Sequence, residues 1–444
     1  MLGLTRYQWL VLFAAWLGWG FDVFDGLLFN FVAPICVPYL LHLPPGDPQT
    51  RGITLFWTAT LTSLLLLGWA LGGIVFGRLT DRLGRTRTLL LTMLTYALST
   101  AACAFAPNLA VLAVFRFLAS LGIGGEWAAG AALVAESLPA KKRVLGGALL
   151  YTSAPMGLFL ATFVNDLFTR KLQFIAADPG ISWRAVFLTG LVPAVVAVII
   201  RTQVREPEAF RKPAAMPRIA ELFEPEYRSR TLGGLALAVV ALVSWWSCSA
   251  FIPVVASFLT SSANKAQLSA RELSQLKTFY ITRGTNCFNL GGLLGTLLTV
   301  PVATRLGRRP MFLLYYSLAT VALLCTFGLD LSPEVRLLMM FTVGITVFGV
   351  FGSFTFYLPE LFPVRLRGTG SGFCYNAGRI ITSLFPFAVG YVARTGKNPL
   401  DILVWVALAP AIGVLFILFG VGMETKHQDT QDEASAALSG RVDG

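Results

Sequence analysis

Long apolar segments recur along this chain and constrain its fold more than any other feature. A stretch of about 18 apolar residues crosses a hydrocarbon core of about 30 Å as a helix, and such stretches occur from one end of the sequence to the other. Lys, Arg, Asp and Glu make up only 13% of the 444 residues, whereas soluble domains contain about 25%. The apolar runs are continuous and do not alternate with period two, which favours helices over a barrel. The chain is therefore predicted to be an all-α integral membrane protein.

Twelve membrane spans are predicted, separated by clusters of Pro, Gly and charge such as "LPPGDPQT". The first span has Arg6 ahead of its apolar stretch, as a signal peptide would, but it is too long for one and contains Asp22 and Asp25. The predicted spans are 9–31, 54–76, 88–106, 108–133, 146–168, 184–200, 232–258, 279–300, 311–329, 335–357, 370–392 and 401–422.

The distribution of basic residues predicts the orientation. With the N-terminus inside, 22 of the 35 Lys and Arg residues fall in cytoplasmic segments, 11 fall outside, and two, Arg116 and Arg379, lie within spans. This asymmetry follows the positive-inside rule. The net charge of +12 therefore reflects topology, and the expected surroundings are membrane lipid, with no nucleic-acid partner. Both termini are predicted to be cytoplasmic.

Cysteine and histidine give no sign of a metal or redox site. The six cysteines lie within spans or at their ends without CxxC spacing, and the two histidines fall outside the spans. Buried cysteines of this kind behave as small apolar residues. No nucleotide fold or nucleophile–base constellation occurs either, so an enzyme and an ATP-driven pump are not supported. No metal and no cofactor is expected.

The chain repeats itself at about half its length. The segment "ESLPAKKR" (136–143) matches "ELFPVRLR" (360–367) at an offset of 224, and "LGR" at 83–85 matches "LGR" at 306–308 at an offset of 223. Duplicated halves are one way to build an alternating-access transporter with its site between them. The predicted parts are an N-terminal six-helix bundle (1–200), a cytoplasmic connector (201–231), a C-terminal six-helix bundle (232–422) and a disordered cytoplasmic tail (423–444).

These features resemble the major facilitator superfamily. A G-x-x-x-D-R-x-G-R pattern follows the second span, and a degenerate copy follows the eighth. The segment "RFLASLGIGGEWAAG" (116–130) is similar to the sugar and metabolite:proton symporter branch. The pair in "DVFD", with Pro34 after it, is similar to the D-G-[YF]-D pattern of aromatic-acid and organic-anion symporters, although Val23 replaces the usual Gly. The resemblance implies two pseudo-symmetric six-helix halves that alternate access across a bacterial inner membrane, working as a monomer.

Asp22, Asp25 and Arg116 are the predicted centre of proton coupling. With a rise of 1.5 Å per residue, Asp22 lies about 20 Å along the first span and Arg116 about 12 Å from the outer end of the fourth, so the three share a level. A charge at mid-membrane costs about 2.5–3.5 kcal/mol, which favours pairing. We expect Arg116 to pair with Asp22 or Asp25 and one aspartate to accept the driving proton. A static ion pair between two helices is the alternative.

Two further predictions concern the same helices. Asp22, Asp25 and Phe29 share a helix face with Gly18, which is predicted to be a cavity-facing stripe. Glu126, in "GIGGEW", is either a second proton site or the partner of a cation on the cytoplasmic side. The glycines beside it are interpreted as helix-packing positions, because no strand precedes them as a nucleotide site would require.

Arg379 is the predicted anchor of the substrate. A cation at mid-depth in the C-terminal half suits an anionic solute, and the alternative is an internal partner for Asp22 or Asp25. Other candidate substrate contacts are polar or aromatic residues within spans. For the aromatic residues the alternative is a lipid-facing position, and for Asn286 and Asn289 it is helix–helix hydrogen bonding. The full set is Arg379, Tyr375, Asn376, Phe29, Tyr151, Trp245, Trp246, Asn286 and Asn289.

Charged residues of the cytoplasmic loops resemble the inner gate of the family, in which carboxylates of one loop pair with arginines of another. Exposed pairs are each worth about 0–1 kcal/mol, but several together bias a two-state equilibrium. The alternative is a role in folding and topology only. The predicted gate residues are Gly77, Asp81, Arg82, Gly84, Arg85, Glu136, Arg143, Arg308, Glu360 and Arg367.

The leading prediction is a secondary active transporter that moves a small organic solute, an organic anion, with protons. The proton gradient is the expected driving force. A sugar or neutral-metabolite carrier of the same fold is the alternative within transport, because the fourth span resembles that branch. A transporter-like membrane sensor is the alternative from another class, and the short connector argues against it.

Overall fold

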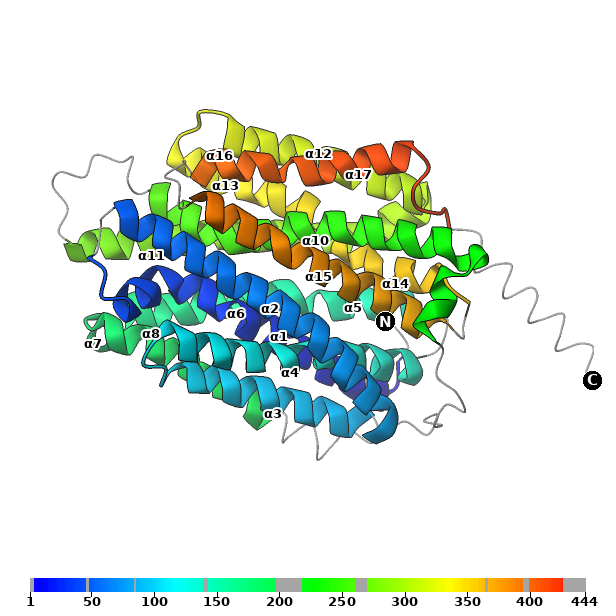
Figure 1. Ribbon diagram of the computed structural model, residues 1–444, viewed down its shortest axis with the longest axis horizontal. Coiled ribbons are helices and arrows are strands. Elements are labelled where there is room, and N and C mark those ends of the chain that lie inside the picture. The colour runs from blue at the N-terminus through cyan, green and yellow to red at the C-terminus, as the bar shows by residue number, and fades with distance from the viewer. Residues whose placement is uncertain are drawn as a thin grey trace, which may run out of the picture.

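The computed structural model describes residues 4–44, 48–83, 85–138, 143–196, 218–259, 270–363, 366–393 and 399–425. Every regular element within these ranges is helical, as the continuous apolar runs predict. The helices run along the long axis of the molecule in one bundle (Figure 1).

Helices of the N-terminal half begin near the start of the chain and end before the connector. They are α1 (Arg6–Leu40), α2 (Pro48–Leu83), α3 (Arg85–Cys103), α4 (Leu109–Ser137), α5 (Arg143–Tyr151), α6 (Ser153–Asp166), the π-helix η2 (Leu167–Lys171), α7 (Gln173–Ala176), α8 (Pro179–Leu188) and the 3₁₀-helix η3 (Thr189–Leu191).

Helices of the C-terminal half follow the same general order of long, apolar elements. They are the 3₁₀-helix η4 (Ile219–Phe223), α10 (Pro225–Leu259), α11 (Ala270–Leu306), α12 (Arg308–Gly328), α13 (Pro333–Val343), the π-helix η5 (Gly344–Phe348), α14 (Phe351–Glu360), α15 (Arg367–Ala393), α16 (Pro399–Val406) and α17 (Leu408–Leu418).

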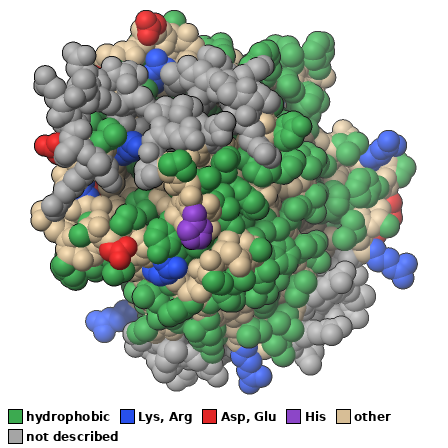
Figure 2. Space-filling view, turned by 60° about the vertical axis from the view of Figure 1, so that its left-hand side comes forward, with side chains coloured by type: hydrophobic (Ala, Val, Ile, Leu, Met, Phe, Trp, Pro, Cys, Tyr) green, Lys and Arg blue, Asp and Glu red, His purple; other side chains and the backbone are tan. Residues whose placement is uncertain are grey.

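Eight helical segments in the described part of the chain are long and apolar enough to cross a membrane. The other four predicted spans coincide with α3, with α5 and α6, with α15, and with α16 and α17. Large apolar side chains are exposed along these helices, as lipid contact requires; Phe13 is 55% and Leu98 57% exposed. Figure 2 shows hydrophobic side chains over much of one face.

Two predicted spans are divided where proline interrupts the helix. Proline has no N–H, so the carbonyl four residues before it loses its hydrogen bond. Pro155 removes the partner of the Tyr151 carbonyl, where α5 ends, and Pro410 removes that of Val406, where α16 ends.

Capping residues set where the helices of the site begin. The Thr5 hydroxyl accepts a hydrogen bond from Gln8 N (3.2 Å) while Gln8 Oε1 accepts one from Thr5 N (3.0 Å), which forms a capping box at the start of α1. Asn108 Oδ1 accepts from Val111 N (3.0 Å) at the start of α4. These caps fix how far along their helices Asp22 and Arg116 lie.

Two predicted boundaries differ from the structure. Helix α10 begins at Pro225, so the last residues assigned to the connector belong to a helix; residues 201–217 lie outside the described ranges. The first residues of the predicted disordered tail are held in place: Met423 N donates to the Tyr357 hydroxyl (3.1 Å). Their hydrogen-bonding groups meet partners on α12 and α14, which the polarity of the tail does not indicate. Residues 426–444 lie outside the described ranges.

The two halves pack against each other through α2 with α15, α6 with α11, and α5 with α14. In Figure 1, α12, α16 and α17 lie along one edge of the bundle and α3 and α4 along the other, with the helices of the interface between them. The candidate site lies among these central helices.

Candidate functional site

Asp22 and Asp25 of α1 lie in the protein interior. Both residues are 0% exposed, and their four carboxylate oxygens have no hydrogen bond of ordinary geometry to the described residues. Asp22 is within electrostatic range of Glu126 on α4 and of Arg379 on α15. Charged groups from both halves therefore meet beside the first helix.

The face of α1 that carries the two aspartates is turned toward α4. A Cβ atom added to Gly18 would lie 1.9 Å from Glu126 Oε1. Phe29, further along the same face, is 1% exposed, and its ring centroid is 6.0 Å from the Arg116 guanidinium. In this structure the predicted stripe therefore contacts α4, and its place in a cavity stays a prediction. Helical spacing groups residues on one face but does not say which neighbour that face meets.

Arg116 contacts α1 at the expected level but through different atoms. Its Nη1 donates to the main-chain carbonyl of Asp25 (2.8 Å), and its Nη2 donates to that of Gly26. No ion pair joins it to either aspartate in the described part of the chain, so the predicted pairing with a carboxylate is corrected. A planar guanidinium presents several donors at fixed angles, and two successive carbonyls of α1 match that fork.

Glu126 is enclosed where α4 meets α1 and α3. It is 1% exposed, and its Oε2 accepts a long hydrogen bond from the Thr92 hydroxyl (3.4 Å). The glycines beside it allow close helix packing: a Cβ at Gly124 would lie 1.9 Å from the Trp69 carbonyl of α2, and one at Gly125 2.3 Å from Phe76 Cβ. The packing interpretation of these glycines is confirmed.

Arg379 lies at the interface between the halves. Its guanidinium carbon is 4.5 Å from the Trp69 ring centroid on α2 and 4.6 Å from that of Tyr375 on α15. Its Nη1 donates to Asn376 Oδ1 (3.0 Å), one turn earlier. The residue is only 4% exposed. Among the described residues it forms no ion pair, and its Nε has no partner.

Aromatic side chains from both halves gather beside Arg379. The ring centroid of Tyr151 on α5 is 4.7 Å from that of Trp19 on α1 and 6.3 Å from that of Phe351 on α14. Trp245 on α10 is 4.7 Å from Trp246, which in turn lies 5.5 Å from Trp69. The structure thus brings the predicted Tyr151, Trp245, Trp246 and Tyr375 together in the interior and not at the lipid surface. We call these rings and Trp69 the central aromatic cluster.

Trp69 and Trp19 were not predicted as site residues. Sequence reasoning missed them because tryptophan within a span is most often interfacial. The signal that would find Trp69 is its distance along α2, since it lies well inside the span 54–76, away from both interfaces.

The two predicted asparagines of α11 lie in different surroundings. The Thr162 hydroxyl of α6 donates to Asn286 Oδ1 (2.7 Å), so Asn286 links the two halves, as the alternative prediction proposed. Asn289 is 0% exposed, and its amide oxygen and nitrogen have no hydrogen-bond partner in the described part of the chain. Of the two asparagines, Asn289 is therefore the one whose side-chain amide is available to hydrogen-bond a ligand.

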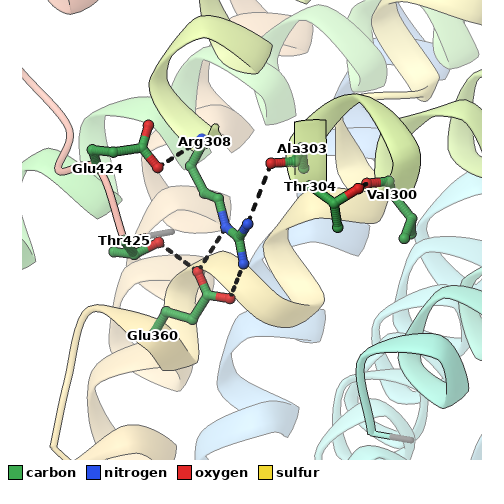
Figure 3. Close-up of polar contacts among 7 residues, drawn as sticks. All are labelled: Val300, Ala303, Thr304, Arg308, Glu360, Glu424 and Thr425. Carbon is green, nitrogen blue, oxygen red and sulfur yellow. Dashed lines mark hydrogen bonds and ion pairs between the residues drawn. The ribbon is translucent and has the colours of Figure 1, made fainter. Parts of the chain in front are cut away.

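Only the C-terminal part of the predicted gate can be described. Arg308 and Glu360 form a buried bidentate pair, with Nη2 to Oε1 at 2.7 Å and Nε to Oε2 at 3.1 Å (Figure 3). Glu424 accepts hydrogen bonds from the main-chain N–H groups of Arg308 (3.0 Å) and Arg309 (3.1 Å). Arg367 Nε donates to the Phe362 carbonyl (3.2 Å). The side chains of Asp81, Arg82, Arg85, Glu136 and Arg143 lie outside the described part, as does Gly84, and Gly77 lies within α2.

The pattern of the Major Facilitator Superfamily matches residues 9–386. The chain belongs to this superfamily. It is 29% identical over 384 residues to a probable 4-methylmuconolactone transporter of Cupriavidus pinatubonensis, covering 86% of this chain and 82% of that one. It is 26% identical over 383 residues to the cis,cis-muconate transport protein of Acinetobacter baylyi, covering 84% and 86%.

A solved structure shares the fold. The crystal structure of a D-xylose-proton symporter superposes with a TM-score of 0.74 and 16% identity, covering 95% of this chain and 99% of that one. The chain is therefore a multi-pass membrane transporter of twelve helices, as predicted, and not an enzyme.

Proposed function

We propose that this transporter carries a small organic anion together with protons, and that Arg379 binds the anionic group. The observation that carries the proposal is the buried guanidinium at the interface of the halves, with no ion pair among the described residues and two flanking aromatic rings. A buried cation without a carboxylate partner is costly, and an anionic substrate would offset that cost. Relatives whose names include muconate and 4-methylmuconolactone support the same class.

We assign the transported proton to the side-chain carboxyl group of Asp22 or of Asp25. An ionised carboxylate is costly to bury without a partner, and neither residue has an ordinary hydrogen bond to the described residues. Arg379 is within electrostatic range of Asp22, so arrival of an anion at Arg379 changes the field at that carboxyl group. The proton gradient is then the energy source, and no cofactor takes part. The excess of basic residues in predicted inner segments supports cytoplasmic termini and a bacterial inner-membrane location.

Uptake by liposomes after a pH jump tests the substrate class. We expect internal acidification with muconate and aromatic carboxylates and none with sugars. Arg379→Gln should raise the substrate KM at least tenfold, since hydrogen bonds to charged groups contribute about 1.5–3 kcal/mol. Arg6→Gln, which changes an exposed arginine, is the control. Acidification with sugars alone would favour the neutral-metabolite carrier.

Counterflow tests the proton site separately. Asp22→Asn or Asp25→Asn should abolish uptake driven by a pH gradient, because an amide cannot exchange the proton. Exchange of labelled for unlabelled substrate, which needs no net proton movement, should continue in the same variant. Uptake that still follows the pH gradient in both variants would contradict the assignment.

A further inference from the structure

A crevice opens between the two halves at the end of α11 opposite the Arg308–Glu360 pair. Its volume is about 420 Å³, within the range of about 300–1,000 Å³ that small-molecule sites occupy. Phe159 of α6 and Arg170 of η2 line one side, and Phe279 and Arg283 of α11 line the other. Neither half forms the crevice alone.

The walls of the crevice are apolar and open to the surroundings of the bundle. Phe279 is 42% and Leu290 48% exposed, and both belong to its lining. Asn286 also lines it and is held by the hydrogen bond from Thr162 of the other half. Because this surface lies along membrane-spanning helices, the molecules that meet it are lipid chains.

The rim of the crevice is positively charged. Asp166 binds Arg170 through both oxygens (2.5 and 2.8 Å) and also lies 3.4 Å from Lys171 Nζ. Arg283 is exposed and has no ion pair within the described ranges, and Glu334 is the carboxylate in electrostatic range of it. Both charged residues of the crevice lining are therefore arginines, Arg170 and Arg283, and Arg283 is the one without an ion pair among the described residues.

We propose that this crevice binds one anionic phospholipid, with its phosphate at Arg283 and part of an acyl chain against Phe159 and Leu290. The apolar walls suit an acyl chain and the cationic rim suits the phosphate. A free anion would use the rim but not the walls, and a zwitterionic lipid would use the walls but gain less from the rim. Since each half supplies one wall, the bound lipid stabilises the arrangement in which α6 and α11 are in contact.

Native mass spectrometry of the purified full-length protein tests this site. The probes are phosphatidylglycerol, phosphatidylcholine with the same acyl chains, and inorganic phosphate. We expect one phosphatidylglycerol to remain bound in preference to phosphatidylcholine, and phosphate not to displace it. Arg283→Gln should weaken that binding about fivefold, the effect of one basic residue at an anionic lipid.

Lys171→Gln is the matched control, because it removes a cation at the same end of the bundle that does not line the crevice. It should leave phosphatidylglycerol binding within about twofold of the original, a change of less than 1 kcal/mol. Equal binding of both lipids, displacement by phosphate, or an equal loss in Lys171→Gln and Arg283→Gln would each overturn the proposal. None of these results depends on which solute is transported.

Discussion

Gly18 holds the Glu126 carboxylate beside α1, and it does so by lacking a side chain. A Cβ at this position would lie 1.9 Å from Glu126 Oε1, whereas a Cβ at Gly20 on the same helix would meet its nearest neighbour, the Ser153 carbonyl, at 3.5 Å. The atom that the methyl group would meet is the end of the buried Glu126 side chain, which must shift, so Gly18→Ala should destabilise the protein by about 1 kcal/mol, the lower end of the cost of overpacking, while Gly20→Ala should be tolerated. Thermal unfolding in detergent measures both.

A second variant separates packing from proton chemistry at this position. Glu126→Ala removes the carboxylate that a Cβ at Gly18 would strike, so Gly18→Ala combined with Glu126→Ala should regain most of the lost stability. If Glu126 also handles a proton, the double variant should regain stability without regaining uptake driven by a pH gradient. Additive losses of stability would show that Gly18 and Glu126 do not act on each other.

At the level of single residues, the sequence identifies the charged groups but not their partners. A charge inside a membrane span is rare enough to point to Asp22, Asp25, Arg116 and Arg379 without any structure. The atoms that satisfy Arg116 are main-chain carbonyls of Asp25 and Gly26. Every residue carries such a carbonyl, so no sequence pattern singles these two out.

At the level of elements, the ends of α12 and α14 are joined by the chain after α17. The side chains of Arg308 and Glu360 are 9% and 8% exposed, and Thr425 donates its hydroxyl hydrogen to Glu360 Oε2 (2.5 Å). Glu424 lies at the N-terminus of α12, where negative charge is favoured by the helix dipole. Glu424 and Thr425, which follow α17 in the chain, therefore stabilise the Arg308–Glu360 ion pair.

The two glutamates should differ in their effect on stability. Glu360→Gln leaves Arg308 without its carboxylate and should cost about 3–5 kcal/mol, as breaking a buried pair does. Glu424→Gln keeps an acceptor at the helix N-terminus and should cost about 0.3–1 kcal/mol. Thermal unfolding of the two variants in detergent gives the comparison. Equal small losses would mean that the pair is effectively solvated.

The positions of helices follow from sequence better than their faces do. Apolar runs of span length predict most of the membrane spans. The positions of proline explain why the helices break before Pro155 and Pro410. A membrane helix that is apolar on all sides has little periodicity, so its buried face is not readable from spacing. This is why spacing groups Gly18, Asp22, Asp25 and Phe29 on one face of α1 but does not identify α4 as its neighbour.

At the level of the whole molecule, the duplication predicts two halves, but the sequence does not say which side is open. The same chain must form both access states, so the balance between them depends on a few contacts across the interface. The contacts at the predicted outer end are Phe56 of α2 with Phe387 of α15 (6.0 Å between ring centroids) and Gly390 against Ala59. Nearer the other end, Gly147 of α5 approaches Thr355 of α14.

Gly390 allows α15 to close against α2 at the predicted outer end, and a methyl group there should open it. A Cβ at Gly390 would lie 2.3 Å from Ala59 Cβ, whereas one at Gly372 on the same helix would have no neighbour within 4 Å. Gly390→Ala should therefore shift the equilibrium toward the outward-open form, and Gly372→Ala should not. The test introduces Phe56→Cys as a labelling site. In intact cells, a membrane-impermeant maleimide should label this cysteine several-fold faster in the double variant with Gly390→Ala than in the variant with Phe56→Cys alone. The chain without Phe56→Cys gives the background from its own six cysteines. Equal labelling in the two glycine variants would mean that this contact does not hold the outer end closed.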